Sequence, residues 1–573
     1  MKSATLRRLL LWTRSGQLRV RLRAWLALRL AARRIAGSGI FDAAWYRRVY
    51  PDLVREPNPA LHYLRRGAAE GRSPGPDFDG PWYLAQQPDA LLRDANPLLH
   101  WLDTGRANPT RPVPVPPPAP AMLLTDAHYA LWVAANERPA PPPPADAPSV
   151  AIATADALPD ADYVIFAAPH LRIHPDALAA IGAALTADPS LDVLYADEDR
   201  IDAAGNRSAP LFKPPFDPDW FAERDLIGHA AAFRRALLRR GDAADPWGAA
   251  LRIARAGGRL ASLPRVLFHA LPGAPPPRTA PPVAAPLPDP APLVSLIVPT
   301  RDRAALLARC ADGVLARTDY PAIEFIVVDN DSREPETAAL LSRLQRDPRV
   351  RVLPFAGPFN WSAMNNAGAE AARGEVLVLL NNDIDVIEPG WLREIASQAL
   401  RPEIGVVGAK LLYPDGTVQH AGMALGQGAS ATHLCRHAAR GDPGHGGMLA
   451  ARRRVSAVTG ACLATRRDVY RRAGGIEAEH LRVTGSDVDL CLRVRAMGLA
   501  VLHTPHALLF HMEAASRGLD ATEAQRARMA SERAYLLQRW GEAAETEAFL
   551  SPSLTVVQEQ LALAPAWISL GFD

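Results

Sequence analysis

Cysteine is scarce in this chain, and long apolar runs are missing. The 573 residues contain four cysteines, none at the CxxC spacing of a zinc cluster. Neither a zinc cluster nor a disulfide framework is therefore predicted, and a reducing compartment is expected. No run of about 18 apolar residues occurs, so no membrane span is predicted. Arginines interrupt every apolar stretch near the N-terminus, which argues against a signal peptide.

The chain also lacks a strong net charge. A formal charge of +3 argues against a dedicated nucleic-acid binder, and we expect no nucleic-acid partner. The charge is uneven, because residues 1–36 hold ten Lys and Arg and no Asp or Glu. Leucines and tryptophans alternate with these arginines, which predicts an amphipathic basic helix. Such a helix can lie on an anionic membrane surface, pack on the rest of the protein or remain a solvated tail.

Proline is abundant, with 54 residues concentrated at 109–120, 138–148 and 272–292. The last stretch is expected to be an extended, semi-rigid spacer and the main domain boundary. The apolar fraction of 48% excludes wholesale disorder. The predicted segments are a basic helix at 1–36, a helical repeat at 41–109, a proline-rich linker at 110–149, an α/β domain at 150–270, a second linker at 271–292, a second α/β domain at 293–520 and a C-terminal helical tail at 521–573.

Residues 41–109 contain two copies of one motif. Phe-Asp, Trp-Tyr, Pro-Asp, Asn-Pro, a His-aromatic-Leu triplet and Gly recur at an offset of 37 and then 38 residues. Asn58 and Asn96 are predicted helix N-caps, each followed by proline at the first helical position. The clustered Trp and Tyr side chains suit core packing, with sugar stacking as the alternative.

Short apolar runs alternate with helical stretches in 293–520, which predicts a parallel sheet with crossover helices. The runs 294–299 and 325–328 end in polar clusters, Thr300-Arg301-Asp302 and Asp329-Asn330-Asp331-Ser332. Ligands bind beyond the carboxyl ends of such strands. Asp and Asn are also helix caps, so each cluster taken singly is a weak signal.

Three further features bear acidic or imidazole groups. The run 375–380 ends in Asn381-Asn382-Asp383-Ile384-Asp385, where a carboxylate could hold Mg²⁺ or Mn²⁺ or simply form a turn. Asp487 and Asp489 begin an amphipathic helix, where acidic residues also complement the helix dipole. His511 follows an apolar strand and could be a metal ligand or a core histidine.

Taken together, these pieces resemble glycosyltransferase family 2 on the GT-A fold, most closely the bacterial O-antigen and cell-surface-polysaccharide transferases with rhamnosyltransferase-like members. The resemblance covers about 230 residues and rests on the order of eight motifs: VSLIVPTRDR (294–303), FIVVDNDS (325–332), GPFNWSAMNNAGA (357–369), LVLLNNDIDV (377–386), LLYPDGTVQHAG (411–422), VTGACLATRR (458–467), GSDVDLCLR (485–493) and FHMEAASRG (510–518).

The resemblance implies roles for particular residues. Asp487 would be the catalytic base of an inverting reaction, and Asp383 and His511 would hold Mg²⁺ or Mn²⁺. The nucleotide-sugar would be bound by Thr300, Arg301, Asp329, Asp331, Asn366, Asn382 and Asp385. Two asparagines, Asn381 and Asn382, stand where the family often has acidic residues, and Ser486 replaces a Glu or Asn.

Residues 150–270 resemble the latter half of the same domain without its carboxylates. Aligning 161–178 with 374–392 places Ala167, Ala168, Pro169 and Leu171 against Asn381, Asn382, Asp383 and Asp385. Pro246 falls at Asp487 and His269 at His511, and the first two strands are expected to be missing. We therefore expect a catalytically inactive, truncated GT-A-like domain. Its trio Asp197-Glu198-Asp199 is expected at the surface or in contact with an acceptor.

The resulting hypothesis is a metal-dependent inverting glycosyltransferase, of hexosyltransferase or rhamnosyltransferase-like type, in surface-polysaccharide or O-antigen biosynthesis. It would take a UDP-, dTDP- or GDP-sugar donor and a glycan or lipid-linked glycan acceptor. The expected location is the cytoplasm, with membrane contact at the inner face if residues 1–36 bind lipid. The alternative is a non-catalytic glycan-binding or scaffold protein. A dehydrogenase is disfavoured, because no GxGxxG follows the first strand.

Overall fold

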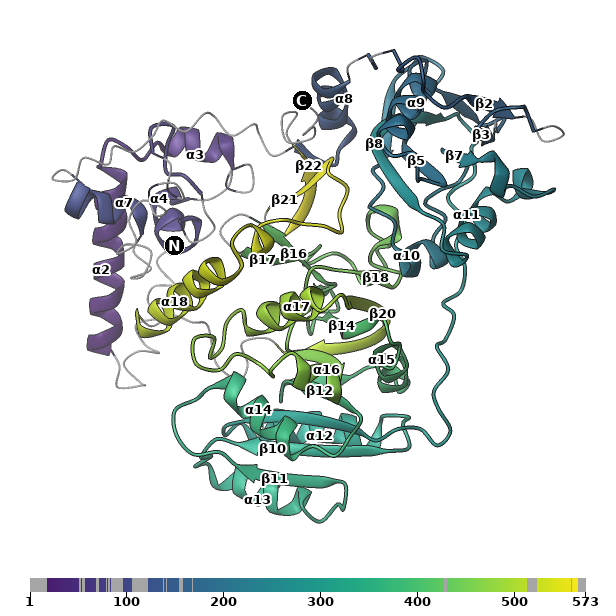
Figure 1. Ribbon diagram of the computed structural model, residues 1–573. Helices are drawn as coiled ribbons and strands as arrows, with labels where there is room; N and C mark the ends of the chain where they lie inside the picture. Colours follow the sequence, from purple (N-terminus) through teal and green to yellow (C-terminus); the bar gives the residue numbers. More distant parts are fainter. Residues whose placement is uncertain are drawn as a thin grey trace. The chain divides into compact units, whose positions relative to one another are not determined.

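The computed structural model describes residues 18–50, 53, 57–68, 72–78, 80, 83, 96–105, 122–137, 139–140, 142–153, 158–166, 168–426, 430–512, 523–557 and 559–564. Two compact units make up the chain (Figure 1). The first comprises 1–121 with 520–534, and the second comprises 122–519 with 535–573. Residues 1–17 of the predicted basic helix and residues 513–518 of the last motif lie outside the described part.

The first unit is helical. Its elements are α2 (Leu18–Ala36), α3 (Ala43–Val49), α4 (Pro59–His62), the π-helical turn η2 (Tyr63–Gly67), α7 (Pro97–His100) and the π-helical turn η3 (Trp101–Gly105), with the first part of α18 (Glu523–Trp540). Asn58 caps α4 by accepting from the Leu61 N–H, and Asn96 caps α7 by accepting from the Leu99 N–H. Both N-cap predictions are confirmed.

Each copy of the repeat contains the same contact between a buried tyrosine and a half-buried histidine. The Tyr46 hydroxyl lies 3.2 Å from His62 Nδ1, and the Tyr83 hydroxyl lies 2.9 Å from His100 Nδ1. The aromatic rings of both copies share one core, to which α2 adds Ile35. Core packing therefore accounts for these aromatic residues better than sugar stacking.

Unit two contains two α/β domains. The C-terminal α/β domain (residues 293–512) has a sheet in the order β11-β10-β9-β12-β19-β14-β20-β13. Its strands are β9 (Val294–Thr300), β10 (Ile323–Asp329), β11 (Val350–Pro354), β12 (Val376–Leu380), β13 (Ile384–Val386), β14 (Ile404–Leu412), β19 (Cys462–Arg466) and β20 (Ala500–His511). Strand β15 (Val418–His420) pairs with β14, β18 (Arg453–Arg454) pairs with β20, and β16 (Met423–Gly426) and β17 (Ser430–His433) form a hairpin.

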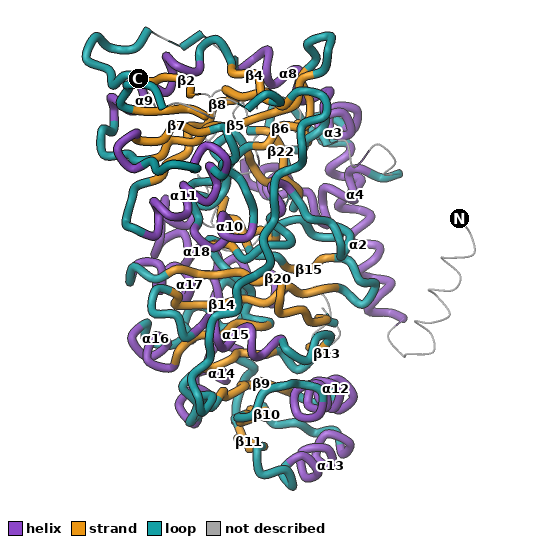
Figure 2. The backbone as a smooth tube through the Cα atoms, turned by 90° about the vertical axis from the view of Figure 1, so that its right-hand side faces the viewer, coloured by secondary structure: helices purple, strands orange, loops and turns teal. Residues whose placement is uncertain are grey.

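Helices cover both faces of this sheet. They are α12 (Ala304–Ala316), α13 (Pro335–Leu344), α14 (Trp361–Ala371), α15 (Trp391–Ala399), α16 (Arg467–Arg472) and α17 (Ser486–Ala496). Strands β9, β10, β11 and β12 are parallel, and β14 is parallel to β20. Strand β19 runs antiparallel between β12 and β14. Six strands, β9, β10, β11, β12, β14 and β20, therefore run in the same direction, and their carboxyl ends lie with the start of β19 at one edge of the sheet. Figure 2 labels β9, β14 and β20 of this sheet.

The N-terminal α/β domain (residues 150–270) repeats this order. Its sheet runs β2-β3-β7-β5-β8-β4, with β6 beside β5, as β15 is beside β14. The strands are β2 (Val150–Ala153), β3 (Tyr163–Phe166), β4 (Leu171–Ile173), β5 (Val193–Ile201), β6 (Arg207–Leu211), β7 (Ala231–Arg234) and β8 (Leu260–Ala270). Helices α9 (Ala177–Ala187), α10 (Pro218–Glu223) and α11 (Pro246–Arg255) complete it.

The strand pairing corrects two details of the predicted duplication. Strand β2 pairs in parallel with β3 as β9 does with β12, so the first strand is present, although we expected it to be missing. Val376 pairs with Arg466, and Tyr163 pairs with Arg234. Asp385 lies nine residues after Val376, and Arg172 lies nine residues after Tyr163, so Arg172 is the residue equivalent to Asp385.

The predicted alignment was therefore wrong by one residue at two places. By this count Arg172, not Leu171, stands at Asp385; Arg172 pairs with His269 in β8, and Asp385 pairs with Phe510 in β20. His269 is thus equivalent to Phe510, not to His511. The helix alignment is supported, because α11 and α17 are each followed by a left-handed glycine, Gly257 and Gly498, at equal distance from Pro246 and Asp487.

The predicted linkers and tail contain more structure than their composition indicated. The stretch 110–149 includes β1 (Met122–Leu123) and α8 (Asp126–Asn136), and the C-terminal tail includes β21 (Leu554–Val557) and β22 (Gln560–Leu563). These strands form one sheet in the order β1-β22-β21, although they come from opposite ends of the chain. The tail is therefore not wholly helical.

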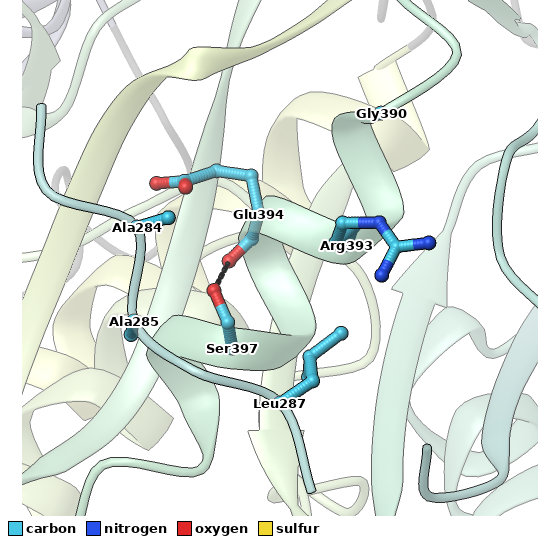
Figure 3. A pocket seen from close by; sticks show the side chains of 7 residues that line it. All are labelled: Ala284, Ala285, Leu287, Gly390, Arg393, Glu394 and Ser397. Carbon is cyan, nitrogen blue, oxygen red and sulfur yellow. Dashed lines mark hydrogen bonds between the residues drawn. The ribbon is translucent and has the colours of Figure 1, made fainter. Parts of the chain in front are cut away.

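The second linker packs along both α/β domains instead of spanning free space. The Asp225 N–H donates to the Arg278 carbonyl at 2.9 Å, and Arg452 Nη1 donates to the Val283 carbonyl at 3.0 Å. Further along, Ala284, Ala285 and Leu287 face α15 across a shallow hollow of about 330 Å³ (Figure 3). None of the predicted site residues lines this hollow.

The two α/β domains also share one hydrophobic core. Trp220 and Phe221 of α10 pack in the same buried cluster as Leu412, Met448 and Leu449 of the C-terminal α/β domain. Ion pairs surround this contact, including Arg401–Asp219 at 2.5 Å and Arg452–Glu223 at 3.1 Å. Among the helices of the described residues, none is both long enough and apolar enough to cross a membrane.

Candidate active site

The first part of the site is the meeting point of β9, β10 and β12. Thr300 and Asp329 are paired in register at the ends of β9 and β10. Asn382, which follows β12, donates from Nδ2 to the Thr300 hydroxyl at 2.9 Å. The sheet therefore brings together three of the residues predicted to bind the nucleotide-sugar, and Thr300 and Asn382 are buried.

Hydrogen bonds join the loops that follow β9 and β10. The Asp302 carboxylate accepts from the Arg333 and Glu334 N–H groups at 2.6 and 2.9 Å, and the Asp302 N–H donates to the Ser332 hydroxyl at 2.8 Å. The backbone bonds from Glu334 and Arg333 hold the pKa of Asp302 below its ordinary value. Asp302 thus shapes this loop pair.

Asp331 and Arg301 lie on the exposed side of the same loops. Asp331 has a left-handed backbone with φ of 51°, and its carboxylate accepts from the Gly357 N–H at 3.3 Å. Beside it, the fully buried Asn330 donates from Nδ2 to the carbonyls of Phe355 and Gly357. Asn330 therefore holds the segment that leads into α14 against the end of β10.

Asp383 and His511 form the second part of the site. Asp383 is 3% exposed, and its Oδ1 lies 3.2 Å from His511 Nε2. Strand pairing holds the two residues together, because Ile384 pairs with His511 and the Met512 N–H donates to the Asp383 carbonyl at 3.0 Å. The core interpretation of His511 is therefore insufficient, since its ring faces a buried carboxylate.

This pair fits one side of a divalent-cation site. A carboxylate oxygen and an imidazole nitrogen are both ligands that Mn²⁺ accepts, and Mg²⁺ is commonly held by one or two carboxylates together with substrate phosphates. Within the described ranges, no group of three or more His, Cys, Asp or Glu is arranged to hold a metal ion. A cation bound by Asp383 and His511 would thus need further oxygen ligands, which a diphosphate supplies.

Asp487 forms the third part of the site, at the first turn of α17. Its Oδ2 accepts from the Gly460 N–H at 2.8 Å, and its Oδ1 accepts from the Val488 N–H at 2.9 Å. Asp489, two residues later, is fully buried and bonds to Arg493 and to the Trp540 indole. The two carboxylates therefore differ: Asp489 holds α17 against α18, whereas the half-buried Asp487 lies beside the turn before β19.

A short chain of contacts connects Asp487 with His511. Next to Gly460, the Ala461 carbonyl accepts from the Asn381 N–H at 3.0 Å. Asn381 Nδ2 lies 3.3 Å from His511 Nε2, and Asn381 Oδ1 accepts from the Trp361 indole at 3.1 Å. A Cβ on Gly460 would lie 2.4 Å from the Trp361 ring, so only glycine fits there. Asp487, Asn381 and the predicted metal pair are thus linked through neighbouring residues at one sheet edge.

The structure gives two of the predicted nucleotide-sugar residues other contacts. Asn366 Oδ1 accepts from the Tyr470 hydroxyl and the Ile476 N–H, and its Nδ2 donates to the Ile476 carbonyl. Asp385 forms an ion pair with Arg317 at the end of α12. We therefore assign Asn366 to the support of the 470–476 turn and Asp385 to the contact between β13 and α12, and neither is included among the proposed donor contacts below.

Sequence reasoning gave no role to Trp361 or Gln419, and it considered Asn330 only as part of the polar cluster that follows the run 325–328. All three lie inside motifs that were recognised, so their positions were visible. Their residue types carry no catalytic signal, because Trp, Asn and Gln neither titrate nor bind metals strongly. Their roles come from contacts with residues distant in the sequence, which the motif order does not reveal.

The equivalent edge of the N-terminal α/β domain is filled by protein. Asp199 of β5 is 2% exposed and bonds to the Tyr129 hydroxyl of α8 at 2.6 Å, to His269 Nδ1 at 2.6 Å and to Arg207. Asp197 is fully buried. The expectation that this acidic trio lies at the surface or contacts an acceptor was wrong for Asp197 and Asp199.

Comparison with known proteins agrees with this geometry. Residues 295–473 match Glycosyl transferase family 2. An uncharacterized protein, y4gI, of Sinorhizobium fredii is 36% identical over 442 residues, which cover 69% of this chain and 49% of that protein. The O-antigen biosynthesis protein RfbC of Myxococcus xanthus is 39% identical over 405 residues, which cover 63% of this chain and 31% of that protein. The chain thus spans half or less of the length of these relatives.

One solved structure with a weaker likeness is the mannosyltransferase PcManGT of Pyrobaculum calidifontis in complex with GDP-Man and Mn²⁺. It is 19% identical with a TM-score of 0.32, over 43% of this chain and 64% of that one. The sheet order and the family match define the C-terminal α/β domain as a GT-A fold. This domain is a glycosyl transferase family 2 domain, and the chain resembles O-antigen biosynthesis proteins.

Proposed function

We propose that this protein is an inverting glycosyltransferase of surface-polysaccharide or O-antigen biosynthesis. It transfers a sugar from a nucleoside-diphosphate donor, a UDP-, dTDP- or GDP-sugar, to a hydroxyl of a glycan or lipid-linked glycan. The observation that carries the proposal is the convergence of Asp487 with the Asp383–His511 pair at one sheet edge. The family match and the O-antigen relative support the same reaction class.

The donor would lie across the carboxyl ends of β9, β10 and β12. Thr300, Asp329 and Asn382 offer hydroxyl, carboxylate and amide groups to the base and ribose, with Arg301 and Asp331 at the exposed side. Asp383 and His511 would hold Mg²⁺ or Mn²⁺ against the diphosphate. When bound, such an ion offsets the negative charge that develops on the leaving nucleoside diphosphate.

Asp487 would act as the general base. Two backbone N–H groups fix the orientation of its carboxylate. The acceptor hydroxyl loses its proton to Asp487 as its oxygen bonds to C1 of the sugar, and the bond between C1 and the diphosphate oxygen breaks. Attack from the face opposite the leaving group inverts the anomeric centre. Holding donor and acceptor in this geometry supplies a further part of the rate enhancement.

A membrane-proximal location would suit a lipid-linked acceptor. On α2, Leu26 and Leu30 are 47% and 62% exposed, next to the exposed Arg29 and Arg33. Exposed leucines beside arginines fit an anionic lipid surface, where each cation near the surface contributes about 1 kcal/mol. We place the protein in the cytoplasm, at the inner face of the membrane.

The competing function is a non-catalytic glycan-binding or scaffold protein, which the inactive N-terminal α/β domain makes conceivable. Nucleotide-sugar hydrolysis with Mn²⁺ distinguishes the two. The Asp487→Asn variant should lose at least about 100-fold in rate, because removing a general base costs 10²–10⁴-fold. The matched control is Asp468→Asn, an exposed carboxylate of α16.

Asp468→Asn should leave the hydrolysis rate unchanged, and both variants should keep the wild-type melting temperature. Equal background rates in the wild type and in Asp487→Asn would refute the enzyme and support the scaffold.

A further inference from the structure

The His511 ring contacts polar side chains through both of its nitrogens. Nδ1 lies 2.7 Å from Gln419 Oε1, whereas Nε2 lies 3.2 Å from Asp383 Oδ1 and 3.3 Å from Asn381 Nδ2. A neutral imidazole carries a proton on one nitrogen and a lone pair on the other, and only the lone pair can bind a metal. The tautomer therefore decides whether the nitrogen beside Asp383 can act as a ligand.

The Gln419 side of the ring determines where the proton sits. Gln419 is 2% exposed on β15, and its Nε2 donates to the backbone carbonyl of His511 at 3.4 Å. A carbonyl can only accept, so the amide NH₂ must face it. Gln419 Oε1 consequently faces the ring and accepts, and Nδ1 must carry the proton.

The other side of the ring gives the same answer independently. The Trp361 indole can only donate, so Asn381 turns its Oδ1 towards Trp361 and its NH₂ towards His511. An NH₂ donor facing Nε2 requires a lone pair on that nitrogen. In a neutral ring, the Gln419 side and the Asn381 side therefore both place the proton on Nδ1, which leaves the Nε2 lone pair opposite the Asp383 carboxylate, where a cation would separate the two acceptors.

We propose that Gln419 is a positioning residue that holds His511 in its Nδ1–H tautomer, so that the Nε2 lone pair is presented beside Asp383 to a divalent cation. Asn381, with Trp361 behind it, supports the same tautomer from the opposite side. This inference rests on the proposed function, since it assigns Gln419 to the metal pair of that site. Partners that orient a metal-binding histidine in this way are typically worth 10–100-fold in metal affinity.

Histidine-selective ¹³C and ¹⁵N labelling with NMR tests the tautomer without metal. The spectrum of His511→Gln identifies the His511 signals among those of the 15 histidines. We expect wild-type His511 to be Nδ1–H, Gln419→Leu to lose that preference, and Gln419→Glu, which keeps an acceptor oxygen, to retain it. The matched control is Gln398→Leu. Gln398 lies on α15, is as buried as Gln419 and accepts a hydrogen bond from Arg401.

Binding of Mn²⁺ alone, followed by the EPR signal of the free ion, supplies the second measurement. Gln419→Leu should weaken binding about 10–100-fold, with Gln419→Glu and Gln398→Leu near wild type. An Nε2–H signal in the wild type, or an unchanged His511 signal in Gln419→Leu, overturns the inference even if Mn²⁺ binds. A wild-type Nδ1–H signal without Mn²⁺ binding instead overturns the metal site of the proposed function, and with it the metal-presenting role of Gln419.

Discussion

Asp197 and Asp199 differ in how their burial is compensated, although both point into the N-terminal α/β domain from β5. Asp199 bonds to Tyr129, His269 and Arg207. Asp197 is fully buried and accepts from the Lys213 N–H at 2.7 Å. Burial raises the pKa of Asp197 to about 7, from an ordinary value of 3.8.

This difference predicts a pH-dependent gain in stability for Asp197→Asn. The folded protein holds the Asp197 proton up to about pH 7, whereas the unfolded chain releases it near pH 4. The wild type therefore loses stability as the pH rises from about 4 to about 7. At pH 8, Asp197→Asn should be more stable by at least about 1 kcal/mol, and at pH 4 it should match the wild type.

Urea unfolding at the two pH values measures this effect. The control is Asp199→Asn, which removes charge from a bonded carboxylate and should be destabilising at both pH values. A pH-independent difference between Asp197→Asn and the wild type would contradict the prediction.

The residues of the candidate site that were predicted best are those whose side chains can bind a cation or take up a proton. Asp383, His511 and Asp487 bear groups that bind cations or take protons, and the motif order brought them into one hypothesis. Asn366 and Asp385 were assigned from the same motifs, yet their polar atoms face Ile476 and Arg317. A sequence shows which groups follow a strand but not which way a short side chain turns.

Among the elements, the six-residue helix α10 connects the two α/β domains. Trp220 is 3% exposed, and its indole donates to the Gly446 carbonyl at 3.0 Å, in the segment 443–454, which ends in β18. That segment also receives the Arg452–Glu223 ion pair. An element of the N-terminal α/β domain thus supports a loop of the domain that bears the candidate active site.

Trp220→Ala should therefore loosen residues 443–454 selectively. Removing a buried tryptophan costs about 3–5 kcal/mol, and here the lost contacts cross the domain boundary. Amide hydrogen exchange across 443–454 should accelerate. Trp391→Ala, which removes a fully buried indole bonded to Thr318 in a different core cluster, should not accelerate exchange there selectively. Equal exchange of this segment in both variants would contradict the coupling.

The strands of the C-terminal α/β domain were predictable, whereas the extent of the linkers was not. Apolar runs such as 294–299 are buried on both faces, so their pattern identifies them directly. Proline content correctly indicates an extended chain at 272–292, but this stretch is not the main domain boundary, because both α/β domains belong to one compact unit. It does not show whether that chain binds a surface, since hydrogen bonds such as Arg452 to the Val283 carbonyl depend on distant residues.

For the whole molecule, the duplication was visible in the sequence because scaffold residues persist: Gly228 and Arg234 stand 232 residues before Gly460 and Arg466. Its register was not, because alanine-rich and apolar strands tolerate a shift of one residue in an alignment. Strand pairing resolves the shift, since one residue turns every side chain to the opposite face. The pairing of β1 with β22 was equally hidden, as nothing local links the two segments.

The membrane proposal also concerns the whole molecule. Deleting residues 1–31 removes Leu26, Leu30 and most of the arginines but keeps the buried Ala32 and Ile35. The shortened protein should sediment less with phosphatidylglycerol vesicles at low salt, with unchanged nucleotide-sugar hydrolysis. Addition of salt should release the full-length protein, because screening weakens the attraction to anionic lipid. Undiminished sedimentation after the deletion would refute the proposal.

The repeated sheet order gives this protein an internal reference position, at which a label can be compared with a label in the candidate site. Arg172 lies in a sheet without counterparts of β10 and β11, at the place that Asp385 occupies in the other sheet, two residues after Asp383. A fluorine or spin label at either position would report from the same backbone setting. In a donor titration, signal changes from the 385 label alone would register occupancy, while drift common to both labels would register only temperature, viscosity or solvent.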